Sequence, residues 1–188
     1  MSILTEIALH PDKTVSDVAV LKRDVVDKVI TLGRGNECEQ PKALLHDKVH
    51  YHSVHTPNKV ALRFRDEVVT YGQLVHQVNR LSAYLQAQNI VPEDRVGVIF
   101  SRNVDMVVSL LAIHQTGAAY VPIDPNLPSD RVEYIVKSSA LKLILSDGSA
   151  AKFAESAQLL NVHVLQDITY ASDNVCHSPY IARDNLAY

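Results

Sequence analysis

The stretch Gly117-Ala118-Ala119-Tyr120-Val121-Pro122-Ile123-Asp124-Pro125 decides the fold predicted for this chain. Its apolar part, residues 119–123, is short, which is typical of a strand buried within a sheet. The glycine at its start suits the C-terminal end of a preceding helix, because glycine readily adopts the left-handed backbone conformation found there. The prolines fix the backbone angles where the strand ends, so we expect a rigid exit from it.

The segments on both sides of this strand alternate between apolar runs and helical patterns. Residues 96–100 are nearly all apolar, as in a strand buried on both faces of a parallel sheet. We predict further strands at 143–145 and 162–165, and helices that start after Asn103, near Pro128 and at Ala150, the last of them ending at Leu160. Such alternation is expected for right-handed βαβ crossovers. The predicted fold class is therefore α/β, with a mostly parallel sheet flanked by helices.

Three elements are predicted ahead of this sheet. A helix from Pro41 to about Thr56 has a thin apolar stripe of Leu44, Leu45, Val49 and Val54. The alternation over residues 60–69 predicts a hairpin that turns at Asp66-Glu67. A long amphipathic helix comes next and ends near Gln88, and its apolar positions recur at helical steps: Leu74, Val78, Leu81 and Leu85.

The first forty residues differ from the rest of the chain. Ser16 or Asp17 can cap a helix, and its apolar positions recur at three- and four-residue steps: Val18, Leu21, Val25 and Val29. Residues 33–36, Gly-Arg-Gly-Asn, then break the helix. We interpret this glycine-rich break as a linker.

Composition narrows the function classes. The 188 residues carry 18 basic and 21 acidic side chains, a formal net charge of -3, without a long run of one sign. Nucleic acid and anionic membranes are therefore poor partners. The sequence shows neither a signal peptide nor an apolar stretch of membrane-spanning length, so we expect a cytoplasmic location. Cys38 and Cys176 are far apart and fit free, reduced thiols.

Motifs for other chemistries are missing from the places where they would be needed. Ser101-Arg102-Asn103 comes after the first buried strand, where a dinucleotide-binding fold would have GxGxxG. The chain also lacks GxxxxGK[ST] and GxSxG, so a hydrolase triad chosen from scattered residues would be arbitrary. Four histidines cluster in one predicted helix: His46, His50, His52 and His55. The first two share a face, but HExxH is absent, so we favour a solvated or partly buried helix over a metal site.

Two ordered motifs give the chain a family resemblance. Residues 117–125, together with Pro128 and Arg131, resemble the LKAGxAYVPIDPxxPxxR signature of the amino-acid-adenylating domains of nonribosomal peptide synthetases, a branch of the AMP-forming ligases. Val69-Thr70-Tyr71-Gly72-Gln73-Leu74 resembles their LTYxEL motif, and Thr70 and Gln73 have the spacing of a capping box. His114, Gln115 and Thr116 depart from the family pattern at the end of a helix.

The resemblance implies an N-terminal subdomain of an AMP-forming ligase, truncated at Tyr188. Residues 1–40 would be a linker resembling the end of a condensation domain, and residues 41–188 the N-terminal part of an adenylation domain. A complete domain would use ATP and magnesium to convert an amino acid to an aminoacyl adenylate and pass it to a carrier protein. Asn185-Leu186-Ala187-Tyr188 would only open the family's phosphate-binding segment, so we assign no catalytic, cofactor-binding or metal residue and no cofactor to this chain.

The region from Pro122 to Arg131 has two interpretations. In the first it is scaffold, and Asp124 pairs with Arg131 to tie the loop to the next helix. In the second it is a wall of the nucleotide cleft.

Two functions remain open at this point. The chain is either a piece of a nonribosomal peptide synthetase, with the rest of the adenylation domain and the carrier and condensation domains as partners, or a non-catalytic remnant or interaction module. An acyl-CoA or aryl ligase of the same superfamily is a weaker alternative. An uncovered sheet edge at the end of the chain would make the isolated chain poorly soluble.

Overall fold

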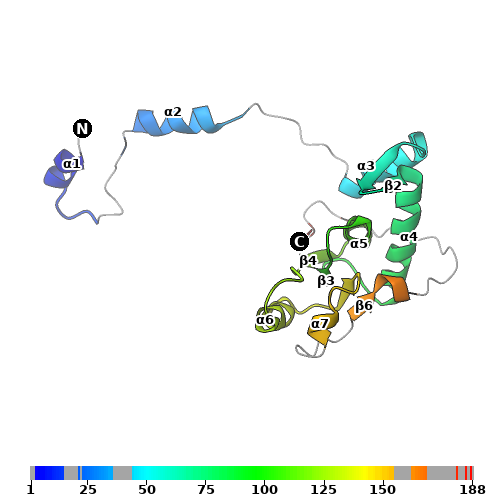
Figure 1. Ribbon diagram of the computed structural model, residues 1–188. Helices are drawn as coiled ribbons and strands as arrows, with labels where there is room; N and C mark the ends of the chain where they lie inside the picture. Colours follow the sequence, from blue (N-terminus) through cyan, green and yellow to red (C-terminus); the bar gives the residue numbers. More distant parts are fainter. Residues whose placement is uncertain are drawn as a thin grey trace. The chain divides into compact units, whose positions relative to one another are not determined.

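The computed structural model describes residues 3–14, 21, 23–35, 44–154, 162–168, 181, 185 and 187. The chain divides into two compact units, Met1–Lys42 and Ala43–Tyr188. The first unit contains helices α1 (Ile3–Leu9) and α2 (Arg23–Gly33), drawn in blue in Figure 1. Neither helix has a buried residue.

The helix predicted in the first unit begins later than expected. Leu21 lies in a bend, and α2 starts at Arg23, so only Val25 and Val29 of the predicted apolar face lie in this helix. Val18 and both proposed caps lie outside the described residues.

A parallel four-stranded sheet forms the centre of the second unit. Its strands are β3 (Arg95–Ile99), β4 (Ala119–Pro122), β5 (Leu143–Ser146) and β6 (Val162–Val164), in the order β4-β3-β5-β6. All three strand pairs within it are parallel. The helices between them are α5 (Val104–Gln115), α6 (Ser129–Ser139) and α7 (Ala151–Ala154). The α/β fold with a mostly parallel sheet is confirmed.

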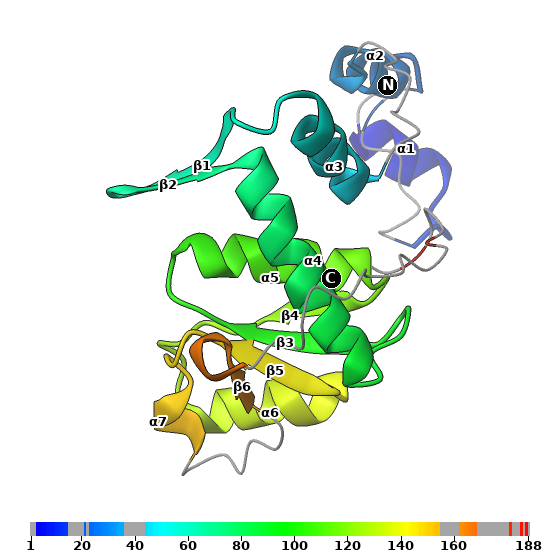
Figure 2. The same ribbon diagram turned by 90° about the vertical axis from the view of Figure 1, so that its right-hand side faces the viewer.

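Helices cover both faces of this sheet, as Figure 2 shows. Helix α4 (Tyr71–Ala87) and α5 lie on one face, and the four predicted core positions of α4 are all buried. They join one apolar cluster with Val96 and Val98 of β3. A second cluster forms on the opposite face, where Val132 of α6 and Phe153 of α7 pack with Ile99 and Ile144. Residues of β3 therefore contribute to both cores.

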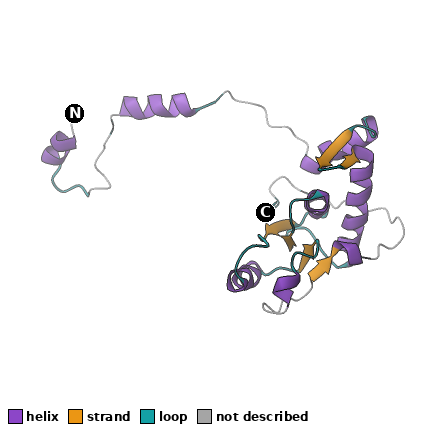
Figure 3. Cartoon of the chain, viewed as in Figure 1, coloured by secondary structure: helices purple, strands orange, loops and turns teal. Residues whose placement is uncertain are grey.

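The hairpin and the long helix after it are also confirmed. Strands β1 (Val60–Phe64) and β2 (Glu67–Thr70) pair antiparallel, and the turn lies at residues 65–66, one position earlier than predicted (Figure 3). Thr70 and Gln73 form the expected capping box, because the Gln73 amide nitrogen donates to Thr70 Oγ1 and the Thr70 amide nitrogen donates to Gln73 Oε1.

The helix α3 (Leu45–His55) differs from its prediction in two respects. It begins at Leu45 and not at Pro41, because Leu44 has an extended backbone and its amide nitrogen donates to Asp47 Oδ2 at 2.8 Å. The predicted apolar stripe is wrong at Leu45 and Val54, which are 64% and 63% exposed, whereas Val49 packs against the core. Pro41 itself lies outside the described residues.

The last two predicted elements are each described in part or end early. Helix α7 covers Ala151–Ala154, and residues 155–160 of the predicted helix lie outside the described part. Strand β6 ends at Val164, where a 3-10 turn, Leu165–Asp167, begins. No helix within the described ranges has the length and apolar content needed to cross a bilayer.

Two buried serines provide a stability test. Ser109 of α5 is fully buried and its hydroxyl has no hydrogen-bond partner among the residues that the structure describes, whereas Ser82 of α4 donates to the Ala112 carbonyl oxygen at 3.3 Å. Since an unsatisfied buried hydroxyl costs free energy, we expect Ser109→Ala to raise the free energy of unfolding by about 1 kcal/mol. The matched variant Ser82→Ala should not raise the free energy of unfolding, because it removes a hydrogen bond. Urea denaturation measures both, and destabilisation by Ser109→Ala would contradict the assignment.

Gly97 of β3 provides a second test. A Cβ atom at this position would lie 2.8 Å from Leu141 Cδ1 and 2.9 Å from Ile144 Cγ1, closer than carbon atoms pack. We expect Gly97→Ala to lower the free energy of unfolding by about 1–3 kcal/mol, as overpacked cores do. Gly33→Ala is the control, because no atom of the described part of the chain lies within 4 Å of the Cβ added there. Equal thermal unfolding midpoints for Gly97→Ala and the wild type would show that β3 and Leu141 are not in close contact.

Candidate functional site

The chain reverses its direction of travel across the sheet at β3. It passes from β3 to β4 on one side and then returns across β3 to β5 on the other. The loop after β3 leads to α5 on one face, and the loop after β5 leads to α7 on the opposite face, so the switch point lies between β3 and β5 (Figure 2). In open parallel sheets, ligands bind outside the carboxyl ends of the strands at such a switch point.

A cleft of about 920 Å³ lies at the carboxyl ends of β3 and β4, next to this switch point, and Ser149 of the loop after β5 also lines it. One wall is apolar and includes Val98 and Phe100 from the end of β3 and Met106 and Leu110 from α5. The strand β4 contributes the half-buried ring of Tyr120 and the exposed Pro122. The remaining lining is mostly polar and comes from three loops: Ser101, Arg102, Ile123, Asp124, Pro125, Asn126 and Ser149.

Asp147 joins two of these loops. Its Oδ2 accepts hydrogen bonds from the Ser101 amide nitrogen at 3.1 Å and from Asn103 Nδ2 at 2.9 Å, and its Oδ1 accepts one from the Ser149 amide nitrogen at 3.1 Å. Ser149 Oγ in turn donates to the Ile99 carbonyl oxygen at 3.1 Å. The loops after β3 and β5 are thereby held together on one side of the cleft.

The two carboxyl groups near this junction have opposite pKa shifts. Burial alone would raise the pKa of Asp147, but the hydrogen bonds from Ser149 and Ser101 outweigh it and lower that pKa. Burial raises the pKa of Asp105, in the first turn of α5, and the nearby Asp147 carboxylate raises it further. Asn103 caps the same helix, because its Oδ1 accepts from the Met106 amide nitrogen at 2.9 Å. The carboxylate of Asp147 is therefore the favoured negative charge at this junction.

The loop after β4 is held differently from the prediction. Asp124 Oδ1 accepts hydrogen bonds from the backbone and side-chain nitrogens of Asn126, at 2.8 and 3.0 Å. The guanidinium of Arg131 lies over the ring of Tyr134, with Cζ 5.3 Å from the ring centroid. The predicted Asp124–Arg131 pair is wrong, because each side chain has a partner nearer to it in sequence.

The clustered histidines of α3 contact protein groups. The ring of His55 stacks on Tyr51 with 3.9 Å between centroids, and the ring of His52 lies 4.9 Å from that of Tyr71. Within the described ranges, no group of three histidine, cysteine or acidic side chains is arranged to hold a metal ion. The arrangement therefore favours a structural role for His52 and His55.

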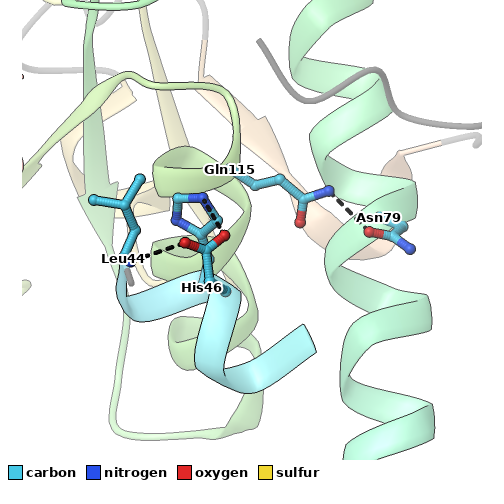
Figure 4. A network of polar contacts seen from close by, with 5 residues as sticks. Leu44, His46, Asn79 and Gln115 are labelled. Carbon is cyan, nitrogen blue, oxygen red and sulfur yellow. Dashed lines mark hydrogen bonds and ion pairs between the residues drawn. The ribbon is translucent and has the colours of Figure 1, made fainter. Parts of the chain in front are cut away.

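His46 lies where α3 packs against α4 and α5. Figure 4 shows it beside the contact in which Gln115 Nε2 of α5 donates to Asn79 Oδ1 of α4 at 2.9 Å. Burial lowers the pKa of His46, partly opposed by the adjacent Asp47 carboxylate, and burial together with the charge of His46 lowers the pKa of His114. Both rings are thus favoured in the neutral form.

The sequence assigns no site residue, and the residues of the cleft come from four separate segments. Pro122 to Asn126 lie in the wall of this cleft, and a role of that wall in nucleotide binding stays a prediction. Sequence reasoning misses Asp147. The signal that could have found it is its place after a predicted buried strand, since the carboxyl ends of parallel strands meet at one edge of the sheet.

Comparison with known proteins agrees with this geometry. The family model described as AMP-binding enzyme matches residues 49–185. Bacitracin synthase 2 of Bacillus licheniformis is 30% identical over 146 residues, and malpinin synthetase of Mortierella alpina is 30% identical over 191 residues. These alignments cover 78% and 100% of this chain but only 6% and 2% of the two relatives.

Solved structures show the same fold. Klebsiella oxytoca NpsA in complex with 3-hydroxyanthranilyl-AMSN aligns with a TM-score of 0.66 and 25% identity, covering 79% of this chain and 30% of that one. The fold, the cleft and the aligned relatives define a part of an AMP-forming adenylation domain of the type found in nonribosomal peptide synthetases. The chain belongs to the AMP-binding enzyme family.

The Asp147 junction gives a pH-dependent prediction. We expect Asp147→Asn to lower the free energy of unfolding at pH 7 by about 1.5 kcal/mol, because hydrogen bonds to a charged acceptor are weakened. The pKa of Asp147 is lowered from 3.8 in the folded state. The stability that the Asp147 carboxylate adds is therefore fully present above pH 3.8, and it is lost as the pH falls through the folded-state pKa.

Urea unfolding at pH 7 and pH 2.5 measures this difference. The difference in the free energy of unfolding between wild type and Asp147→Asn should be smaller at pH 2.5 than at pH 7. Asp124→Asn, which affects contacts within one loop, is the control. An equal gap at both pH values would show that the Asp147 charge does not stabilise the junction.

Proposed function

We propose that this chain is the opening part of the adenylation domain of a nonribosomal peptide synthetase. In its complete form the domain activates an amino acid with ATP to an aminoacyl adenylate and loads it on a carrier protein. The observation that carries the proposal is the cleft at the carboxyl ends of β3 and β4, next to the switch point of the sheet, in a chain whose family model extends from residue 49 to residue 185. The curated relatives support it by their class, although the chain spans only 2–7% of their length.

The described residues of the cleft do not fit ATP with magnesium by themselves. Phosphate oxygens in such enzymes are held by several backbone N–H groups, cations and magnesium ligands. The described lining offers one cation, Arg102, and one carboxylate, Asp124, beside a largely apolar wall. Asp124 already accepts two hydrogen bonds from Asn126. We therefore assign no catalytic or cofactor-binding residue and derive no chemical step for this chain.

The role proposed for the chain is to supply one wall of the site. Strand β3 and helix α5 present the apolar surface, and Asp147 holds the loops after β3 and β5 in place. The remaining groups would come from the rest of the adenylation domain, with carrier and condensation domains as further partners. Residues 1–40 would connect to a condensation domain, and the whole assembly would work in the cytoplasm.

Sequencing the transcript beyond the codon for Tyr188 tests the proposal. We expect the reading frame to continue into a glycine-rich phosphate-binding segment. The polypeptide encoded by the complete frame should catalyse amino-acid-dependent exchange of pyrophosphate into ATP, whereas residues 1–188 alone should not. The 188-residue chain is the matched control, because it contains the same cleft wall. An in-frame stop codon directly after Tyr188, found in repeated sequencing, would overturn the proposal and favour the non-catalytic interaction module.

A further inference from the structure

Helix α3 is attached to the rest of the second unit by few apolar contacts. It contains no buried residue, and Leu45 and Val54 are mostly exposed. Val49 packs against the apolar cluster that includes β3, and the ring of His52 lies 4.9 Å from that of Tyr71. Because the stabilisation from apolar burial is small here, the polar groups between α3 and the helices α4 and α5 decide whether α3 stays in place.

The imidazole of His46 lies in this interface. Its side chain is only 16% exposed, and its Nε2 is 3.8 Å from Asp47 Oδ1. The Asp47 side chain is 54% exposed, and its carboxylate also accepts a hydrogen bond from the Leu44 amide nitrogen at the start of α3. An ion pair with such an exposed carboxylate adds little free energy, so a proton on His46 is poorly compensated.

A second imidazole, that of His114, reaches the same interface from the last turn of α5. It is half-buried, and its ring lies edge-on to that of Tyr120 of β4, with 5.5 Å between the centroids. It also interacts electrostatically with His46. The carboxyl end of a helix favours a positive charge, so one proton on His114 is tolerated more readily than charges on both rings.

Helix α4 presents an uncharged group to this interface in the contacts that the structure describes. Its Asn79 Oδ1 accepts a hydrogen bond from Gln115 Nε2, and Figure 4 shows this contact beside His46. Arg80 of α4 lines a separate cavity together with Asp105 of α5. The described contacts therefore place the two imidazoles beside one largely solvated carboxylate, that of Asp47.

Protonation of both rings places two like charges in a partly desolvated interface. Like charges repel more strongly there than in water, because the effective dielectric constant is lower. Moving α3 away separates the two charges and returns His46 to water. The contacts of Val49 and His52 are lost in exchange.

We propose that His46 and His114 form an acid-sensitive latch, which holds α3 against α4 and α5 at neutral pH and releases it as the pH falls toward 5. The latch goes beyond the proposed function and does not depend on it, because the contacts that carry it lie within residues 44–120 of this chain.

The direction of the pH dependence follows from the two rings. Burial lowers the pKa of His46, and burial together with the charge of His46 lowers the pKa of His114, in both cases from an ordinary value of 6.5. The attached state therefore binds fewer protons than the released state. The attachment of α3 is strongest above pH 6.5, and it weakens as the pH falls through the lowered pKa values.

Hydrogen exchange of the 188-residue chain at pH 7.5 and pH 5.0, corrected for the intrinsic effect of pH on the exchange rate, tests the latch. We expect the protection of the Val49 and His52 amides to be about five- to tenfold lower at pH 5.0, at the lower end of the range for coupled equilibria. Val96 and Val98 lie in β3, and their amides should keep their protection.

Two variants remove one ionisable ring each, His46→Gln and His114→Leu. Leucine is the residue that the LKAGxAYVPIDPxxPxxR signature has at position 114. Each variant should abolish most of the pH-dependent loss of protection in α3. His50→Gln is the matched control, because His50 is an exposed histidine on the same helix, and it should behave as the wild type does.

The hydrogen-exchange outcomes are decisive in both directions. A loss confined to α3, present in the wild type and in His50→Gln and absent from the other two variants, would confirm the latch. Equal protection at both pH values in the wild type, or an undiminished loss in His46→Gln, would overturn it. A loss shared by β3 would show that the whole unit unfolds in acid, which would also overturn the latch. This comparison of α3 with β3 in the wild type needs no variant.

Titration of the imidazole rings by NMR tests the coupling of the two histidines separately. Replacing His46 by glutamine should raise the pKa of His114, because a nearby like charge is removed. An unchanged His114 pKa in His46→Gln would show that the two rings do not interact, and the latch would be overturned.

Discussion

The close packing of β3 is the constraint on which the rest of the second unit depends. This strand bonds to β4 on one side and to β5 on the other, and both of its faces are covered by helices. Gly97 lets the strand approach Leu141 and Ile144 more closely than any side chain would allow. Because the chain leaves β3 in one direction and returns across it in the other, the same strand also fixes the position of the cleft.

The loops after β3 and β5 are held together by one charged acceptor. Asp147 binds groups from the loop after β3 and from its own loop, and the hydrogen bonds that it accepts keep its pKa low despite burial. Asp105 nearby has a raised pKa, so the two carboxyl groups do not compete equally for negative charge. This arrangement gives the cleft a rigid side at β5. On the side beyond β4, the Tyr120 amide nitrogen donates to the carbonyl oxygen of Ala187.

The sequence predicts the fold well wherever local patterns decide it. Leu74 and Val78 share one helix face, Thr70 and Gln73 cap that helix, and the run at 96–100 is apolar on both faces, and all three predictions are confirmed. Prediction from the sequence fails where the position of a residue depends on parts of the chain that are distant in sequence. Leu45 and Val54 fit an apolar helical stripe, yet both side chains are mostly exposed. Asp147 could not be found from spacing, because 46 positions separate it from Ser101, which the sheet topology alone brings beside it.

A crystal structure of the polypeptide that continues beyond Tyr188, bound to a non-hydrolysable aminoacyl adenylate analogue, tests the central claim most directly. The account predicts that the analogue lies at the carboxyl ends of β3 and β4. An analogue bound away from the carboxyl ends of β3 and β4 would contradict it.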